Sequence, residues 1–199
     1  MVKELDQLGF TNWCTNVRNV LKDIYFDDVW DNQCIDDYPH FITLVKERIR
    51  KAYIQYWQDS INDSVSSPKL RTYKLFKTTF CNEKYLTCIQ GDQLIRAVAR
   101  LRMSSHDLAI ERGRYTKPKT LLNDRTCKRC NLEEIDDEKH FLLRCDTFSI
   151  HRQSLLYTCR LKCSNFKDYT PDEQFVFIMT SKDNIIIQSL ATFVHKCFK

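Results

Sequence analysis

The chain has 199 residues and a formal net charge of +5, and 43% of its residues are hydrophobic, 12% aromatic and 29% charged. This length and composition can bury a sizeable core in one domain or two small ones, which excludes a chain too polar to fold. Three glycines and four prolines leave few tight turns, which favours helices over a sandwich or barrel. We therefore expect a mostly α protein.

The sequence carries no pattern of a membrane or secreted protein. The longest apolar runs, such as FVFIM, are far shorter than the roughly 18 to 20 residues that a membrane-spanning helix needs. The stretch MVKELDQLGF has no apolar signal-peptide core. We expect an intracellular protein, nuclear or cytoplasmic, that is not secreted and binds no membrane. Its ten cysteines are then expected as reduced thiols and not as a disulfide framework.

The first third of the chain predicts two helices separated by an acidic loop. In TNWCTNVRNVLKDIY (residues 11–25), apolar residues recur every three or four positions, and Thr11 is expected to cap a short amphipathic helix. FDDVWDNQCIDDYPH (residues 26–40) predicts an acidic loop. Pro39 can then lie in the first turn of a longer helix, which NDSVSSP (residues 62–68) ends.

The tetrapeptide YFDD (residues 25–28) imitates the Tyr-x-Asp-Asp of polymerase palms, where paired carboxylates hold magnesium ions. A polymerase also needs an aspartate on a preceding strand and a region that holds the template, and 24 residues precede YFDD. We interpret YFDD as a coincidental acidic segment in a loop or at a helix end, outside any β-hairpin.

Two further helices are predicted in the middle of the chain. A helical stripe of apolar residues runs from Leu70 to Phe80. Asp92 is expected to cap the helix DQLIRAVARLRM (residues 92–103). Arg96 and Arg100 are four residues apart on this helix, so they share one face.

Helical periodicity is lost between residues 111 and 126, and helical signals return after Cys145. Residues 148–159 predict one helix, Thr170 and Pro171 open the next, and Ser181 is expected to cap the last. We expect three regions: a helical, linker-like region (1–99), a basic segment with a small Cys/His knuckle (100–146), and C-terminal helices that pack on the rest (147–199).

Basic residues are concentrated before and within the knuckle. Residues 96–129 contain ten basic and three acidic residues, whereas residues 1–40 contain three basic and eight acidic ones. Such a segment can neutralise the phosphates of RNA or DNA and release counterions, although a solvated basic surface has the same composition. The candidate nucleic-acid contacts are Arg96, Arg100, Arg102, Arg112, Arg114, Lys117, Lys119, Lys128 and Arg129.

A metal-ligand pattern, C-x2-C-x9-H-x4-C, lies in CKRCNLEEIDDEKHFLLRC (residues 127–145), with ligands Cys127, Cys130, His140 and Cys145. Two thiolates from a C-x2-C turn and a second pair from the following helix complete the tetrahedron that Zn²⁺ prefers. A catalytic zinc keeps one position open for water, so four protein ligands indicate one structural zinc ion. The expected fold is mostly α with a small zinc-stapled knuckle, a short hairpin plus a helix, between Arg112 and Asp146. Unrelated thiols or a redox pair are the alternatives.

The acidic run EEIDDE (residues 133–138) lies inside this pattern. It lacks the alternating oxygen ligands and the glycine of a calcium loop, so we interpret it as a solvated turn. Asp137 is expected to cap the helix that carries His140.

Other candidate sites are weaker. Cys159 and Cys163, with His151 before them, would be a second metal site, but two core thiols have the same helical spacing and are favoured. The isolated histidines have no nucleophile or acid paired with them in sequence, and no Gly-rich phosphate loop, G-x-S-x-G or H-E-x-x-H occurs. These histidines are His40, His106 and His195. We therefore expect no enzyme, no catalytic residue and no small-molecule substrate.

Two runs of this sequence resemble the segment downstream of the polymerase domain in reverse transcriptases of non-LTR retrotransposons. They are RLRMSSHDLAIERGRY (residues 100–115) and NDRTCKRCNLEEIDDEKHFLLRC (residues 123–145). In that family a run RxRxxxHxLxIExGR precedes a C-x2-C…H-x4-C zinc element. The earlier DVWDNQ (residues 28–33) resembles the linker region of such proteins. The matching residues are Arg100, Arg102, His106, Leu108, Ile110, Glu111, Gly113 and Arg114, followed by Cys127, Cys130, His140, Phe141, Leu142 and Cys145.

The resemblance implies a zinc-binding, nucleic-acid-contacting C-terminal module of an element that copies RNA into DNA. The family's endonuclease and polymerase are missing here, so we expect a non-enzymatic remnant that binds RNA or DNA. A zinc-stabilised module for a protein partner is the alternative, and a working polymerase fragment would need a partner chain that supplies the palm. An exposed basic patch beside the knuckle favours the first, and an exposed apolar patch favours the second.

Overall fold

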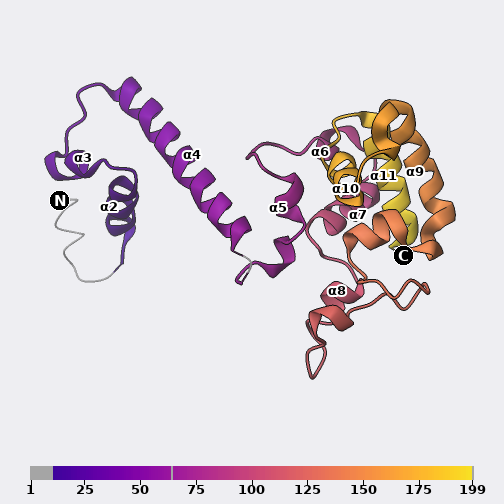
Figure 1. The fold of residues 1–199 in the computed structure, drawn as a ribbon. Coiled ribbons are helices and arrows are strands. Elements are labelled where there is room, and N and C mark those ends of the chain that lie inside the picture. Colours follow the sequence, from indigo (N-terminus) through magenta and orange to yellow (C-terminus); the bar gives the residue numbers. More distant parts are fainter. Residues whose placement is uncertain (1–10, 64, 199) are drawn as a thin grey trace. The chain divides into compact units, whose positions relative to one another are not determined.

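The computed structural model describes residues 11–63 and 65–198 (Figure 1). Residues 1–10, in which we expect no signal-peptide core, lie outside this part of the chain. Contacts between residues divide the chain between Asp59 and Ser60 into two compact units. This division falls inside the expected linker-like region 1–99. Within the described residues, no helix is both long and apolar enough to cross a membrane.

The first unit contains the helices α2 (Trp13–Asp23) and α3 (Asp27–Asn32) and most of α4 (Tyr38–Asn62). Arg48 of α4 donates to the main-chain oxygens of Ile24 and Tyr25 at 2.8 and 2.7 Å. Its guanidinium lies 4.1 Å from the centroid of the Phe26 ring. One arginine therefore satisfies the carbonyls at the end of α2 and covers an aromatic side chain of this unit's core.

Two expectations for this unit are wrong and three are confirmed. Asn12, not Thr11, caps α2, because its side chain accepts from the Thr15 main-chain N–H at 3.1 Å. The expected acidic loop contains α3, whose first turn carries Asp27 and Asp28 at the end where negative charge is favourable. Pro39 lies in the first turn of α4, and α4 ends at Asn62, as predicted. YFDD is a turn followed by the start of α3, which confirms that it is not a β-hairpin.

The second unit, from Ser60 onward, contains the remaining elements. Its α-helices are α5 (Tyr73–Phe76), α6 (Tyr85–Cys88), α7 (Asp92–Arg102), α8 (Ala109–Arg112), α9 (Ser149–Lys162), α10 (Pro171–Thr180) and α11 (Asn184–Cys197). Short 3-10 segments are η1 (Pro68–Leu70), η2 (Leu122–Asp124), η4 (Asp146–Phe148) and η5 (Ser164–Lys167), and η3 (His140–Arg144) is a π-helix.

The core of this unit forms where α11 packs against both α7 and α9 (Figure 1). Leu101 of α7, Leu155 of α9 and Phe193 of α11 are buried there. Phe141 of η3 is fully buried in the same core and stacks on Phe198 with ring centroids 4.7 Å apart. The metal-ligand segment is therefore anchored in the main core by its own aromatic residue.

Helix caps in this unit follow local side-chain geometry. Thr170 and Pro171 open α10, as the sequence predicts, and Thr170 caps it in a reciprocal arrangement with Glu173. Gly91, not Asp92, precedes the first turn of α7. Asp183, not Ser181, caps α11, because its carboxylate accepts from the main-chain N–H groups of residues 185 and 186.

The mostly α class is confirmed, and two details of the middle of the chain are wrong. The predicted stripe from Leu70 to Phe80 is interrupted, because α5 ends at Phe76 and the buried Lys77 turns its ammonium to the Cys81 carbonyl at 2.6 Å. No strand forms in the described residues. Thr126 and Ile135 make a single antiparallel bridge, so the expected hairpin of the knuckle is reduced to this bridge.

Candidate metal centre

Short main-chain contacts bring the four predicted ligands together. On either side of the bridge, Cys127 N–H donates to the Glu134 carbonyl at 2.8 Å and Asp136 N–H to the Arg125 carbonyl at 2.9 Å. The chain therefore returns on itself around Cys130. Asp137 then caps the helical turn, as predicted, by accepting from the His140 N–H at 2.8 Å.

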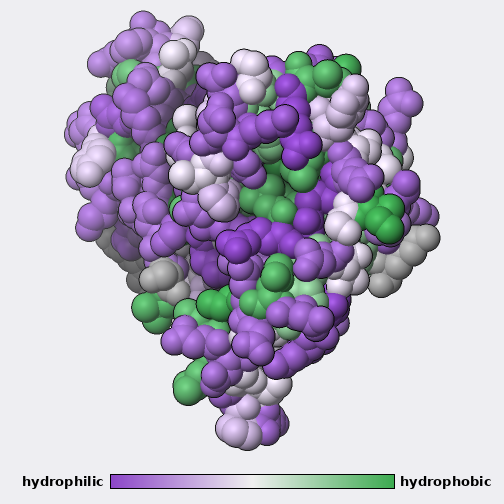
Figure 2. Space-filling model, turned by 45° about the vertical axis from the view of Figure 1, so that its right-hand side comes forward, coloured by the Kyte–Doolittle hydropathy of each residue, from purple (hydrophilic) through white to green (hydrophobic). Residues whose placement is uncertain are grey.

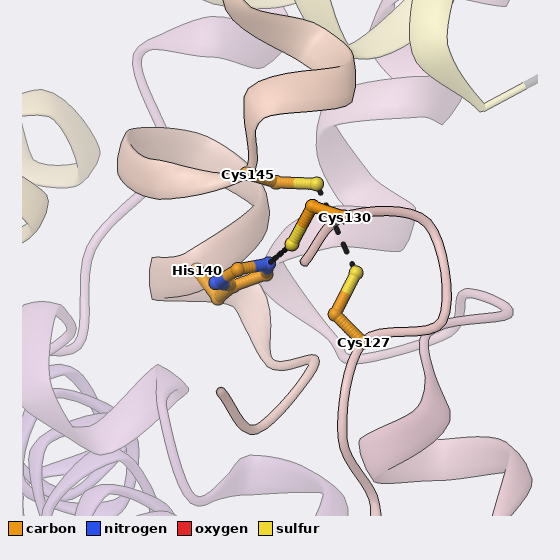
Figure 3. A group of neighbouring side chains, drawn as sticks. All are labelled: Cys127, Cys130, His140 and Cys145. Carbon is orange, nitrogen blue, oxygen red and sulfur yellow. Dashed lines mark hydrogen bonds between the residues drawn. The ribbon is translucent and has the colours of Figure 1, made fainter. Parts of the chain in front are cut away.

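The donor atoms of Cys127, Cys130, His140 and Cys145 all lie within 4.8 Å of one another (Figure 3). Sγ of Cys127 and Sγ of Cys145 are 3.8 Å apart, and Sγ of Cys130 is 3.3 Å from Nε2 of His140. Metal–sulfur bonds of about 2.3 Å in a tetrahedron separate sulfurs by a little under 4 Å. The convergence predicted from the sequence is confirmed, and the group could hold a single metal ion.

The surroundings of this group suit a bound cation. Burial, together with the neighbouring Cys127 thiol, raises the pKa of the Cys145 thiol to about 11. The buried thiol is therefore costly to deprotonate. A bound metal ion would offset this cost, because it binds the thiolate and stabilises its negative charge. His140 Nδ1 lies 3.0 Å from a Glu134 carboxylate oxygen, and donation to that oxygen leaves the Nε2 lone pair to face Cys130.

A buried carboxylate, Glu138, lies two residues before His140. It accepts from Arg71 at 2.7 and 2.8 Å, from Ser104 at 2.5 Å and from His106 at 2.9 Å. Burial alone would raise the pKa of Glu138, but the hydrogen bond from His106 and the charge of Arg71 outweigh it and lower the pKa to about 2. His106 thus has an acidic partner that its sequence neighbours do not reveal.

Asp136 is a second buried acid in the same run. Its carboxylate accepts from Arg129 and from the Ala109 N–H, each at 2.7 Å, and its carbonyl accepts from the Ile110 N–H at 3.2 Å. The interpretation of EEIDDE as a solvated turn is therefore wrong for Asp136 and Glu138, which are 2% and 0% exposed. These two acids tie the ligand segment to α8 and to the loop after α7.

The run RLRMSSHDLAIERGRY mostly packs inward. Leu108 and Ile110 are buried in the core, and Glu111 is buried against Arg71 and Arg114. A Cβ atom on Gly113 would lie 2.7 Å from Cγ of Arg125. Most of the residues that carry the resemblance therefore have a structural role in this chain.

Two of the predicted nucleic-acid contacts are already engaged. Arg102 is buried, and it donates to the Met179 carbonyl at 2.6 Å and to Glu83 at 2.9 Å, so its prediction as a surface contact is wrong. Arg129 pairs with the buried Asp136, as described above. Both guanidiniums satisfy buried oxygens of the protein, but only Arg102 is buried, whereas Arg129 is exposed.

Several other predicted contacts surround Tyr115, which lines two adjoining hollows. The basic hollow, about 540 Å³, is lined by Pro68, Arg71, Ile110, Arg114, Tyr115, Lys119, Leu122 and Arg125. The mixed hollow, about 370 Å³, is lined by Lys69, Arg100, Ser104, Ser105, His106, Asp107, Glu111, Arg112 and Tyr115. The structure thus groups Arg100, Arg112, Arg114 and Lys119 around one aromatic side chain.

The remaining predicted contacts lie outside these hollows. Arg96 is exposed on α7, Lys117 is exposed in the loop after α8, and Lys128 is exposed in the knuckle. Sequence reasoning missed Lys69 and Arg71, which lie before α5, and it counted Arg125 among the basic residues without assigning it to the site. Lys69 and Arg71 were missed because they lie far along the chain from the basic segment 96–129.

The second, less favoured metal site does not form in the described part of the chain. Cys159 is fully buried in the core, whereas His151 is exposed, and the one metal-competent group among these residues is the Cys127 cluster. The interpretation of Cys159 as a core thiol is confirmed.

Comparisons with known proteins add no identification. No family model matches the chain, and no curated protein or solved structure is significantly similar to it.

Proposed function

We propose that Cys127, Cys130, His140 and Cys145 bind one Zn²⁺ ion with a structural role. Three thiolates and one imidazole form a ligand set that zinc accepts in a tetrahedron, and four protein ligands leave no position for a reacting water. Cys127, His140 and Cys145 are buried, which fits a closed site. The ion would hold the turn around Cys130 against η3.

The proposed zinc site supports the basic segment through the two buried acids. Asp136 lies between Cys130 and His140 in the chain and accepts from the N–H of Ala109 at the start of α8. Glu138 holds Arg71, which also contacts Glu111 of α8. Loss of the ion would loosen residues 127–145 and, through these contacts, the cations that follow α8.

We propose that the chain is a non-enzymatic nucleic-acid-binding protein whose basic surface is held in place by this knuckle. The observation that carries the proposal is the basic hollow, which Arg71, Arg114, Lys119 and Arg125 line and which has no carboxylate among its described lining residues. Several cations within reach of successive phosphates are what RNA or DNA binding requires. The resemblance of residues 100–145 to the C-terminal zinc-binding region of retroelement reverse transcriptases supports the same function.

The test removes two exposed cations that do not hold the knuckle. Arg112→Ala with Lys119→Ala should lower the slope of log affinity against log salt by about two, one for each phosphate that is no longer neutralised. Arg114 is left intact because it contacts the buried Glu111. Lys167→Ala with Lys182→Ala removes the same charge from other exposed positions and is the matched control. Equal slopes for the two double variants would count against the proposal.

A protein-interaction module is the second candidate, and one observation favours it. Ile150, Tyr157 and Leu161 lie on one face of α9, opposite the buried Leu155 and Cys159, yet they are 78%, 62% and 67% exposed. Figure 2 shows that hydrophobic side chains, in green, are exposed among hydrophilic ones on the face it draws. Because the exposed Arg160 flanks this stripe, the partner that fits is an amphipathic helix with an acidic edge.

A further inference from the structure

Tyr115 is an exposed aromatic residue held by an ordered loop. Its side chain is 67% exposed, and its N–H donates to the Arg112 carbonyl at 3.1 Å directly after α8. The Gly113 carbonyl accepts from the Thr120 N–H and from the Thr116 hydroxyl, each at 3.0 Å. These bonds close the loop 113–120 on itself, so the ring is presented to solvent from a fixed backbone.

The basic hollow beside this ring has an excess of positive charge. Of its four cations, Arg71 contacts the carboxylates of Glu111 and Glu138, and Arg114 contacts that of Glu111. Arg125 donates to the carbonyls of Ile110 and Thr120 at 2.9 to 3.1 Å and, within the described residues, to no carboxylate. The exposed Lys119 adds a second charge. Carbonyls orient a guanidinium without neutralising it, so the hollow is suited to an anion.

The walls of the basic hollow are apolar where they are not charged. Pro68, Ile110 and the half-exposed Leu122 line it together with the cations and Tyr115. On the side of the mixed hollow, Nζ of Lys69 lies 5.8 Å from the centroid of the Tyr115 ring. A ligand with a planar apolar part and a phosphate would match this combination of ring, apolar wall and fixed cation.

We infer that Tyr115 and the basic hollow bind an unpaired nucleotide of a single strand, with its base stacked on the Tyr115 ring and a phosphate beside Lys119 and Arg125. The inference rests on the proposed nucleic-acid function and names the form of nucleic acid that this site takes. A base in a duplex is already stacked on both faces, whereas a base in a single strand offers a free face to an aromatic side chain. Duplex binding would use the surrounding cations alone.

The experiment measures the affinity of the full zinc-loaded chain for a short oligothymidine and for a duplex of equal length at one salt concentration. Tyr115→Ala should weaken single-strand binding by roughly 5- to 100-fold, the loss of one stacked base, and Tyr115→Phe should keep it. Duplex affinity should stay within about twofold, because the charges are unchanged. Tyr157→Ala, which removes an exposed tyrosine from α9, is the control and should change neither affinity.

A second measurement uses only the parent chain and is independent of how any variant folds. An oligomer of abasic deoxyribose phosphates carries the same charge as oligothymidine but has nothing to stack, so it should bind more weakly by a similar factor. Equal affinity for the two oligomers, or equal losses on single strand and duplex in Tyr115→Ala, would overturn the inference while leaving the proposed function intact. If the parent binds neither single strand nor duplex, both fail.

Discussion

The carboxylate of Glu138 lies 2.9 Å from Nε2 of His106, although 32 residues separate them in the chain. Both side chains are fully buried, and Ser104 and Arg71 donate to the same carboxylate. Because Glu138 begins the helical turn that carries His140, this contact joins the metal-ligand segment to the loop after α7. Glu138 thus ties the helical turn of the knuckle to the interior of the second unit.

Glu138→Gln should destabilise the protein strongly. The amide keeps the size of the side chain but removes the buried charge that accepts from Arg71, Ser104 and His106, and loss of one partner of a buried ion pair costs about 3 kcal/mol. Urea unfolding of the full zinc-loaded chain would measure the loss. Glu133→Gln, an exposed change in the same acidic run, is the control and should be close to neutral. Equal midpoints for the two variants would refute the structural role of Glu138.

Cys130→Ser should abolish stoichiometric zinc binding, because a neutral hydroxyl replaces one of the four ligands. The parent chain should retain one zinc per molecule after dialysis, measured by elemental analysis. Cys34→Ser changes an exposed thiol in the first unit and should retain the same amount. Unchanged zinc in Cys130→Ser would mean that the metal is held elsewhere.

Glu134→Gln should weaken zinc binding without removing a ligand. The carboxylate orients His140 through Nδ1 at 3.0 Å, and removal of such a partner lowers metal affinity by about 10- to 100-fold. Competition with a chromogenic chelator would measure the change. Glu134 also pairs with Arg144, so Arg144→Gln is the matched control: it removes that ion pair and leaves the histidine contact. Equal affinity losses in both variants would contradict the orienting role.

Gly113→Ala should disturb the loop that carries Tyr115. The added methyl group would lie 2.7 Å from Cγ of Arg125, and overpacking of this kind costs about 1–3 kcal/mol. In an Arg125→Ala background the same substitution should cost much less, because the atoms that it meets are gone. A double-mutant cycle of unfolding free energies, measured by urea denaturation, gives this coupling. Additive losses of stability would show that the methyl group added at residue 113 does not clash with the Arg125 side chain.

The metal ligands could be predicted from the sequence because their spacing is local and the chemistry of thiolates and imidazole is general. The buried acids could not, since their partners are distant: Arg71 is 67 residues from Glu138, and a dense acidic run is ordinarily solvated. Arg102 was misplaced for the same reason, because the carbonyl it binds belongs to Met179, 77 residues away. The presence of helices was predicted better than the residues that cap them. Several polar residues lie near each helix start, and the sequence does not indicate which of them adopts the extended backbone of a cap.

The most direct test of the proposed function is the salt dependence of binding by the full chain, with zinc and after its removal. Affinity for single-stranded RNA and for duplex DNA would be measured over a range of salt concentrations. We expect the zinc-loaded chain to bind near physiological salt, with log affinity falling linearly against log salt, and a weaker and shallower dependence once zinc is removed. An absence of binding near physiological salt would refute the proposed function and favour the α9 stripe as the functional surface. The same affinity and slope without zinc would refute the supporting role of the metal.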